Sequence, residues 1–452
     1  MPGKNVVILD GAASGDNDLS PVLSVLSEVL KRDGAQVETF PLREMKLAHC
    51  LGCFGCWLQT PGMCVEADAG REIARAISRS DTTVLFTPVT FGGYSPELKK
   101  MMDRFIQLIS PYFQMDHGEV HHPPRYAHRP RLVMVGVQRH PNPHEAHIFK
   151  TLAGRNAINF HPPSYAAEVV LATDNADALR GRFEALLTRS DALPFGEAAA
   201  SLMPAPVTLG TAVEPVSARR VLLIVGSPKT KSPSTSSVLG GYLLDRLKER
   251  GWETESLTLR ASLNRPEGEG ELLASVERAG LILLVFPLYA DALPYLVTKA
   301  LAVIAAHRRA SGQPFPPRLV GIVNSGFPET RQNAVALAIC REFAAQTGFK
   351  WAGSLALAAG GMIGSQPLTE AKRSSPPVKH VVAALEMTAA ALAEGRPVPA
   401  EAVRLISKTP IPLMPFALWR WMYVRFGGKG FEKVAAKNGV SRDKMLAQPY
   451  AA

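Results

Sequence analysis

Four of the five cysteines of this chain lie in one short stretch, at C-x2-C-x2-C-x7-C spacing, and the fifth, Cys340, is far away. Thiolate sulfur is the ligand that iron–sulfur clusters and zinc prefer, and closely spaced sulfurs can surround one metal centre without long-range folding. Gly52 and Gly55 give this loop the backbone freedom that such wrapping needs. The candidate metal ligands are Cys50, Cys53, Cys56 and Cys64.

Three interpretations of these cysteines stay open. A 4Fe–4S cluster needs four thiolates, and the loop supplies them if Cys64 reaches back past the turn at Pro61-Gly62. A closed zinc site is a second interpretation, although zinc ribbons usually carry two separated C-x2-C pairs. The third interpretation is a set of unligated or redox-active thiols.

The composition is that of a globular protein with more than one domain. Apolar residues make up 46% and charged residues 20% of the 452 positions, which is close to average. The N-terminus enters a strand-like run without a signal-peptide pattern, and the longest apolar runs are too short to span a membrane. We therefore expect a cytoplasmic protein, in which clustered cysteines favour metal or redox chemistry over disulfides.

Short apolar strands alternate with amphipathic helices in the first part of the chain, giving five β-α units. We expect strands at residues 6–10, 36–40, 83–87, 132–137 and 167–171, and helices at residues 19–31, 69–80, 95–109, 144–156 and 176–187. Strands separated by helices predict a parallel sheet covered on both faces, with ligands bound at the carboxyl ends of the strands.

The same alternation restarts after a segment rich in Ala, Pro, Gly and Ser. We expect strands at residues 220–225, 253–259, 281–286, 319–323 and 351–357, and helices at residues 236–250, 271–279, 295–307, 330–347 and 378–393. The repeat predicts an α/β protein with two tandem, doubly wound, five-stranded parallel sheets and a basic helical C-terminal tail. The expected division is a first domain at 1–190, a linker at 191–218, a second domain at 219–398 and the tail at 399–452.

Much of the net charge of +10 comes from the tail. From Glu401 onward it contains nine Lys and Arg residues and three acidic residues, a difference of +6. Nucleic-acid binding is therefore not expected. Aromatic residues between Phe416 and Phe426 alternate with Arg420 and Arg425. A docking helix that covers another part of the protein and a peripheral membrane contact are the two main interpretations of this segment.

The loop after the first strand of the second half has the composition of a phosphate site. Gly226-Ser227-Pro228-Lys229 leads into a helix, so that backbone N–H groups, hydroxyls and a lysine meet at a positive helix end. The alternative is that Ser and Thr only cap the helix. The candidate contacts are Ser227, Lys229, Ser232, Ser234, Thr235 and Ser236, with Asn324, Ser325 and Gly326 on a later loop.

These motifs resemble the flavodoxin-like, NAD(P)H-dependent FMN reductase superfamily, and the cysteine loop is similar to that of its iron–sulfur flavoproteins. The resemblance covers both halves up to about residue 395 and implies FMN with its phosphate in the first loop and a 4Fe–4S cluster close to the flavin. It also implies that the flavin ring rests on the loop after the third strand. The ring contacts would be Pro88, Val89, Thr90, Phe91, Gly92 and Gly93 in the first half, and Pro287, Leu288, Tyr289 and Ala290 in the second.

The two halves differ in their first loops. Residues 10–18 of the first half carry acids where a dianionic phosphate would bind, and Ser14 is the candidate contact there. The second half has the better phosphate loop but no cysteine cluster. One of the two flavin sites could therefore have decayed.

Seven of the eleven histidines lie between His117 and His147, and His121-His122 precede Pro123-Pro124. We expect a long loop here that covers the flavin, because imidazoles near neutral pKa can donate protons or bond the flavin. A metal site is the less favoured interpretation, since no carboxylate or cysteine pattern completes it.

The expected function is that of an FMN-dependent oxidoreductase that transfers electrons from NAD(P)H to a small-molecule or protein acceptor, through a 4Fe–4S cluster if the cysteines hold one. Two alternatives remain: a flavin and iron–sulfur electron carrier without enzymatic activity, and a redox-sensing protein with degenerate flavin sites. The resemblance also implies a homo-oligomer, because reductases of this superfamily commonly pair to complete their sites.

Overall fold

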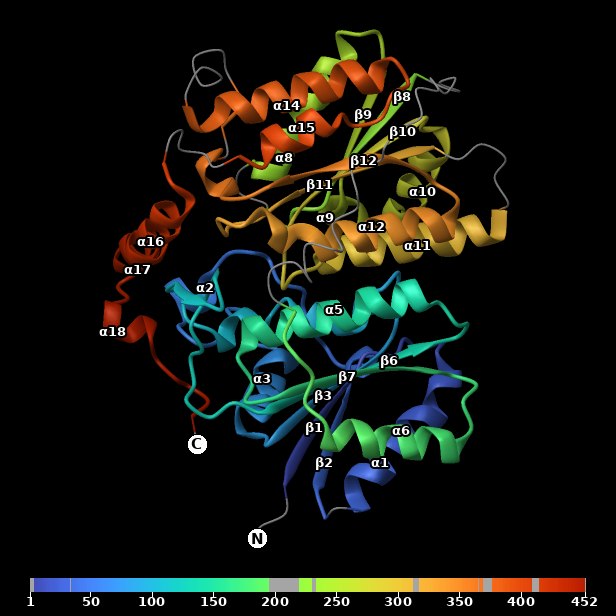
Figure 1. Ribbon diagram of the computed structural model, residues 1–452, viewed down its shortest axis with the longest axis vertical. Helices are drawn as coiled ribbons and strands as arrows, with labels where there is room; N and C mark the ends of the chain where they lie inside the picture. The colour runs from blue at the N-terminus through green and yellow to red at the C-terminus, as the bar shows by residue number, and fades with distance from the viewer. Residues whose placement is uncertain are drawn as a thin grey trace. The chain divides into compact units, whose positions relative to one another are not determined.

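The chain divides into two compact units, one made of residues 1–197 with residues 421–452 and the other of residues 198–420. The computed structural model describes residues 4–32, 34–194, 219–229, 233–311, 317–364, 366–368, 376–408 and 414–451. Each unit is built on its own sheet (Figure 1). Within the described ranges, no helix combines the length and apolar character that a membrane crossing requires.

The first unit contains a five-stranded parallel sheet in the order β2-β1-β3-β6-β7. Its strands are β1 (Asn5–Asp10), β2 (Gln36–Pro41), β3 (Thr82–Pro88), β6 (Arg131–Gln138) and β7 (Tyr165–Leu171). Most of these strands are buried along their length because helices cover both faces of the sheet. The strand order reverses between β1 and β3, and ligands of such sheets bind at the carboxyl ends beside this point.

The helices of the first unit form two layers. One layer pairs α1 with α6, whose apolar residues pack with β1, β3 and β6 in one core (Figure 1). The other layer includes α3 and α5 (Figure 1). The helices, 3-10 turns and the small hairpin are η1 (Asn17–Leu19), α1 (Ser20–Arg32), η2 (Leu42–Glu44), α2 (Gly55–Leu58), α3 (Ala69–Arg79), α4 (Pro96–Met102), η3 (Phe105–Leu108), β4 (Gln114–Asp116), β5 (Glu119–His121), α5 (Pro143–Phe160) and α6 (Ala176–Thr188).

The second unit repeats this topology with the sheet order β9-β8-β10-β11-β12. Its strands are β8 (Arg220–Val225), β9 (Glu253–Thr258), β10 (Leu281–Pro287), β11 (Arg318–Asn324) and β12 (Lys350–Leu357). Its helices are α8 (Thr235–Lys248), α9 (Leu259–Leu263), α10 (Gly268–Arg278), α11 (Tyr295–Ser311), η4 (Thr330–Asn333), α12 (Ala334–Thr347), η5 (Gly360–Met362), α14 (Pro376–Ala393) and α15 (Ala400–Ile406). The predicted α/β class with two five-stranded parallel sheets is confirmed.

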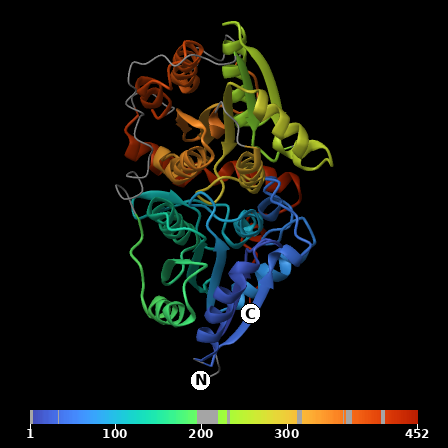
Figure 2. The same ribbon diagram turned by 90° about the vertical axis from the view of Figure 1, so that its right-hand side faces the viewer.

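The C-terminal tail is shared between the units, and the division falls after Arg420. It contains α16 (Phe416–Phe426), α17 (Gly428–Lys437) and α18 (Arg442–Met445) after α15. The segment from α17 onward belongs to the first unit, which carries both ends of the chain (Figures 1 and 2). Its last residues bond with α3, where the Ser78 hydroxyl donates to the Tyr450 carbonyl at 3.1 Å. The predicted linker at 191–218 lies almost entirely outside the described residues, and the membrane contact of the tail stays a prediction.

The helix predicted at residues 95–109 is wrong in its second half. Helix α4 ends at Met102, and the chain continues through Asp103 and Arg104 into the short 3-10 turn η3. Asp103 forms a buried ion pair with Lys99 of α4, and the Arg104 guanidinium lies 2.7 Å from the Asp68 carboxylate. The Arg104–Asp68 ion pair lies at the break and ties it to the cap of α3, whereas the Lys99–Asp103 pair has the i,i+4 spacing of the helix itself.

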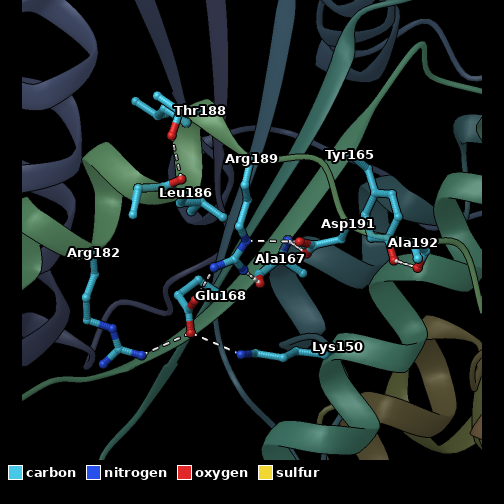
Figure 3. A network of polar contacts seen from close by, with 12 residues as sticks. Lys150, Tyr165, Ala167, Glu168, Arg182, Leu186, Thr188, Arg189, Asp191 and Ala192 are labelled. Carbon is cyan, nitrogen blue, oxygen red and sulfur yellow. Dashed lines mark hydrogen bonds and ion pairs between the residues drawn. The ribbon is translucent and has the colours of Figure 1, made fainter.

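An ion network holds the outer strand β7 to the chain that leaves α6 (Figure 3). The Glu168 carboxylate accepts hydrogen bonds from Lys150 at 3.1 Å, Arg182 at 3.0 Å and Arg189 at 2.9 Å. Burial alone would raise the pKa of Glu168, but the hydrogen bonds from Arg189 and Lys150 outweigh it and lower this pKa to about 2. The network therefore stabilises the folded state only while Glu168 is ionised.

We expect Glu168→Gln to lower the free energy of unfolding by about 1–2 kcal/mol at neutral pH, a value reduced for the solvent exposure of the three cations. A lowered folded-state pKa gives stability above the ordinary value of 4.5, and this stability is lost as the pH falls toward 2. Urea unfolding at several pH values measures the effect. Asp177→Asn, at an exposed surface pair with Arg180, is the control and should change stability by less than about 0.5 kcal/mol.

Candidate functional site

The two units carry the same tight turn after the third strand. In the first unit, the Thr90 and Gly93 backbones exchange hydrogen bonds of 3.0 and 2.8 Å, and the residues between them, Phe91 and Gly92, have φ of 55° and 82°. The turn is anchored by the Val89 N–H, which donates to Val137 at 2.9 Å. All six predicted ring contacts of this unit, Pro88 to Gly93, lie at this turn on the carboxyl edge of the sheet.

In the second unit, Tyr289 and Ala292 exchange two backbone hydrogen bonds of 3.0 Å. The residues between them, Ala290 and Asp291, have φ of 47° and 56°, a region that non-glycine residues adopt at a cost. Leu288 N–H anchors the turn to Asn324 at 2.8 Å. Two unlike sequences thus adopt the same strained turn at the carboxyl edges of the two sheets. The predicted residues Pro287 to Ala290 lead into and form the first part of the turn in the second unit.

The first loop of the second unit begins at Gly226, whose N–H donates to Val285 at 2.8 Å. Ser227 is 5% exposed, and its hydroxyl accepts the Lys229 N–H at 3.5 Å. Ser234 caps α8, and its side chain and that of Ser237 form a capping box. The capping interpretation therefore applies to Ser234, while Ser232 lies outside the described residues.

A polar cluster connects this loop to the loops after β11 and β12. Asn324 donates to the Ser236 hydroxyl at 2.7 Å, and the Thr235 hydroxyl donates to the Gly360 carbonyl at 3.2 Å. Asn333 donates to the Ser325 hydroxyl at 3.2 Å. The structure thus brings Thr235, Ser236, Asn324 and Ser325 together at one edge, with Gly326 adjacent in the chain.

Gly226 is a position where the chain cannot accept a side chain. A Cβ atom there would lie 2.2 Å from Val297 Cγ2 and 2.9 Å from Phe286 Cβ. We expect Gly226→Ala to destabilise the second unit by about 1–3 kcal/mol. Gly241→Ala, inside α8 with open space around the new Cβ, should instead stabilise it by up to about 1 kcal/mol. Urea unfolding of both variants checks this opposite pair of signs, and equal effects would contradict it.

The first loop of the first unit is filled by carboxylates. Asp10, 2% exposed, accepts the Ala12 N–H at 3.0 Å and pairs with Arg43 at 2.5 Å. Asp16 accepts the Ala13 N–H at 2.7 Å. Arg139, which follows β6, pairs with Asp16 at 2.6 Å and with Asp18 at 2.8 Å. Ser14 is exposed in this loop.

The cysteine loop runs from the carboxyl end of β2 to α3, and both its ends are tied together. Asp68, the cap of α3, accepts the Ala48 N–H at 2.7 Å and the Arg104 guanidinium at 2.7 Å. Arg104 also donates to the carbonyls of Ala48 at 3.1 Å and Glu66 at 3.4 Å. One buried arginine therefore closes the loop that carries the four cysteines.

Backbone N–H groups inside the loop point at two of its sulfurs. Gly52 N–H donates to Cys50 Sγ at 3.5 Å, and Gly55 N–H donates to Cys53 Sγ at 3.4 Å. Cys53 is exposed and Cys56 is buried. In the part of the chain that the structure describes, no three His, Cys, Asp or Glu side chains stand in position to hold a metal ion.

The four thiols are close enough to influence one another electrostatically. Burial raises the pKa of Cys50 to about 12, and the charges of Asp103, Cys64 and Cys53 add to the effect. Burial also raises the pKa of Cys56 well above its ordinary value, with further contributions from the other three cysteines of the loop. The donor set therefore fits a thiolate-ligated centre in chemical type, because a bound metal ion would stabilise thiolates that burial disfavours, but the four side chains are not arranged as a ligand set in the described residues.

The last residues of the chain pack onto this loop. Phe431 of α17 contacts the rings of Phe54 and Trp57, with centroids 5.5 and 5.3 Å away. Gln107 Oε1 accepts hydrogen bonds from the Cys64 N–H at 3.1 Å and the Tyr450 hydroxyl at 3.3 Å. The cysteine loop is therefore buried on one side by residues almost 400 positions later in the sequence.

The histidine-rich segment is not the long loop that we expect from the sequence. Residues 114–121 form the hairpin β4–β5, and His121 is fully buried with its ring nitrogens near Glu119 and Asn159. His122 packs against Trp57, and burial lowers its pKa to about 4. The interpretation of these two histidines as part of a loop that covers the flavin and donates protons is wrong, because their rings pack inside the first unit.

Sequence reasoning missed the part that four arginines play in organising these loops, although Asp103-Arg104 belongs to the motif that resembles the family. The four are Arg43, Arg104, Arg139 and Arg260. Arg260 follows β9 and donates to the Pro228 carbonyl at 3.2 Å. Arg43 occupies the equivalent place after β2, because Pro41 and Thr258 stand opposite the last residues of β1 and β8. The residues that follow them, Leu42 and Leu259, are both fully buried. The internal repeat could have paired Arg43 with Arg260, but their partners depend on the fold.

Comparison with known proteins adds the family context. Residues 5–170 match the family model described as NADPH-dependent FMN reductase, which is less than half of the chain. An iron–sulfur flavoprotein of Methanocaldococcus jannaschii is 28% identical over 99 residues, 22% of this chain and 50% of that protein. An iron–sulfur flavoprotein of Archaeoglobus fulgidus is 29% identical over 87 residues, 19% of this chain and 39% of that protein. The chain thus spans half or less of the length of these curated relatives.

Among solved structures, NAD(P)H:quinone oxidoreductase from Methanothermobacter marburgensis has a TM-score of 0.32 at 16% identity, covering 40% of this chain and 96% of that one. An FMN-dependent NADH-azoreductase of Bacillus anthracis in complex with FMN has a TM-score of 0.28 at 16% identity, covering 38% and 99%. At these TM-scores the similarity to either structure is weak. The match to the FMN reductase family model, over residues 5–170, lies within the first unit.

Proposed function

We propose that this protein is an FMN-dependent oxidoreductase that takes electrons from NAD(P)H and passes them to a small-molecule or protein acceptor. The observation that carries the proposal is the repeated turn, Thr90–Gly93 and Tyr289–Ala292, at the carboxyl edge of a sheet whose strand order reverses beside it. The family match over residues 5–170 supports the choice of flavin as the ligand.

The second unit offers the residues that would hold FMN. The proposed phosphate contacts are backbone N–H groups at the start of α8, the Ser227 and Ser236 hydroxyls, Lys229 and Arg260, which donates to the Pro228 carbonyl of the same loop. Asn324 fixes Ser236, and the Leu288–Ala290 backbone supplies polar groups for the ring. These side chains bind and orient the cofactor, and no acid–base pair of the protein is needed for hydride transfer from a nicotinamide to a flavin.

We assign the cysteine loop of the first unit to a 4Fe–4S cluster, with Cys50, Cys53, Cys56 and Cys64 as ligands. The names of the archaeal relatives support this assignment, and so does the C-x2-C-x2-C-x7-C spacing of the four cysteines within one loop. FMN exchanges electrons in pairs or singly, and an iron–sulfur cluster exchanges them singly. The N–H groups of Gly52 and Gly55 would tune such a cluster by bonding its sulfur ligands, and the α17 segment would keep water away.

Anaerobic rapid mixing tests the proposed activity. Addition of NADH or NADPH to the FMN-loaded protein should bleach the flavin absorption, and a quinone added afterwards should restore it. If dithionite reduces the flavin while neither nicotinamide does, the protein is an electron carrier and the enzymatic proposal is wrong. A homo-oligomer is part of the same proposal and is checked by light scattering.

A further inference from the structure

We propose that the chain binds one FMN phosphate, in the second unit, because the first unit fills the equivalent place with its own carboxylates. This inference rests on the proposed function and goes further by separating the roles of the two units. The inference also means that the family match and the proposed phosphate site lie in different units. Residues 5–170, which match the family model, belong to the unit that we infer to exclude the phosphate.

The hydrogen bonds of the two sheets fix which residues are equivalent. Asp10 and Val225 both end the first strand, opposite Phe86 and Val285 of the third strand. The next residues, Gly11 and Gly226, each donate an N–H of 2.8 Å to the third strand.

It follows that Ala12 stands where the second unit has Ser227, and Ser14 stands where it has Lys229. At these two positions the first unit therefore lacks the hydroxyl and the cation that the second unit offers to a phosphate.

The N–H groups that a phosphate would need are already bonded in the first unit. Asp10 accepts from Ala12 at 3.0 Å, and Asp16 accepts from Ala13 at 2.7 Å. A carboxylate that accepts backbone N–H bonds in such a loop takes the part that a phosphate oxygen would take. Binding of FMN here would have to displace two internal carboxylates from their donors.

The charges of the two loops also differ in sign. Around the first loop, the two guanidinium groups of Arg43 and Arg139 pair with four carboxylates, so that the net charge of this group is 2 − 4 = −2. The carboxylates are those of Asp10, Asp16, Asp18 and Glu44. A phosphate dianion added to this group meets net repulsion.

In the second loop, the described residues 226–229 and 233–236 contain no acid, and Lys229 and Arg260 are both cationic. Arg260 forms no ion pair within the described residues, and its one hydrogen bond goes to the Pro228 carbonyl. Its equivalent in the first unit, Arg43, is paired with Asp10, whose own equivalent is the apolar Val225. The same arginine is thus neutralised in one unit and left for an anion in the other.

The test is titration of the full chain, freed of flavin, with FMN and with riboflavin, which lacks the phosphate. Wild type should saturate at one FMN per chain. Lys229→Ala with Arg260→Leu should weaken FMN binding by about 100-fold or more, because two charge-assisted bonds to the phosphate are lost. Riboflavin should bind wild type about as weakly as FMN binds this variant.

The matched first-unit variant is Arg139→Leu, which removes the other arginine that could grip a phosphate. It should leave FMN affinity within about twofold of wild type, and circular dichroism should show all proteins folded. Two FMN per chain, or loss of FMN from Arg139→Leu but not from the second-unit variant, would overturn the inference and leave the proposed function standing. Wild type that binds no FMN would overturn both.

Discussion

Replacing Cys53 with alanine is expected to remove the iron and sulfide from protein purified without oxygen, from about four of each per chain to less than one. Cys53 is the exposed cysteine of the loop, so its removal disturbs little packing and reports on ligation. The FMN content should not change, because the proposed phosphate and ring contacts lie in the second unit. Iron and sulfide assays, with flavin released from the same sample, measure the result.

Cys340→Ala is the control for this experiment. Cys340 is buried in α12 of the second unit, far in sequence from the other four cysteines, and burial raises its thiol pKa. It should leave iron and sulfide at their wild-type values. If Cys53→Ala retains its iron, the cluster assignment is wrong, and if both variants lose it, the loss reflects damage to the fold.

Removing the Arg125 side chain is expected to have the largest effect on stability. Arg125 is 4% exposed and donates to four carbonyls, two within its own region at Gln107 and Ile109 and two in the C-terminal segment at Met445 (2.9 Å) and Ala447 (2.8 Å). Arg125→Met would leave these buried acceptors without their charged donor, and we expect a loss of about 3–5 kcal/mol in the unfolding free energy.

The same variant should also release the C-terminal segment from the cysteine loop. Limited proteolysis after α16 should become faster, and the cluster should become more sensitive to air. Arg129→Met, an exposed neighbour, should change stability by less than about 0.5 kcal/mol. Equal behaviour of the two variants would show that Arg125 does not hold the segment in place.

The sequence was sufficient for the sheets and for the edge at which ligands bind. The buried strands are continuous runs of apolar residues, as in Leu281–Phe286. Few sheet topologies are possible for such runs when amphipathic helices separate them. Because parallel strands end at the same edge, the loops at Pro88 and Pro287 could be assigned to that edge before any coordinates.

The long-range contacts that hold the loops of the site in place could not be predicted from the sequence. The pairs Arg104–Asp68 and Arg43–Asp10 join residues more than 30 positions apart, and nothing local distinguishes these arginines from surface ones. The burial of His121 follows from the β4–β5 hairpin, whose three-residue strands are too short for a periodic pattern. The contact of Tyr450 with Gln107 joins the end of the chain to its first quarter and depends on the completed fold.

The visible absorption spectrum of the full chain purified without oxygen, with FMN, iron and sulfide determined per chain, tests the central claim most directly. We predict flavin bands above the broader absorption of an iron–sulfur cluster, one FMN and about four iron atoms per chain, and bleaching of the flavin on addition of NAD(P)H. Colourless protein that contains no iron and takes up no FMN would contradict the proposed oxidoreductase.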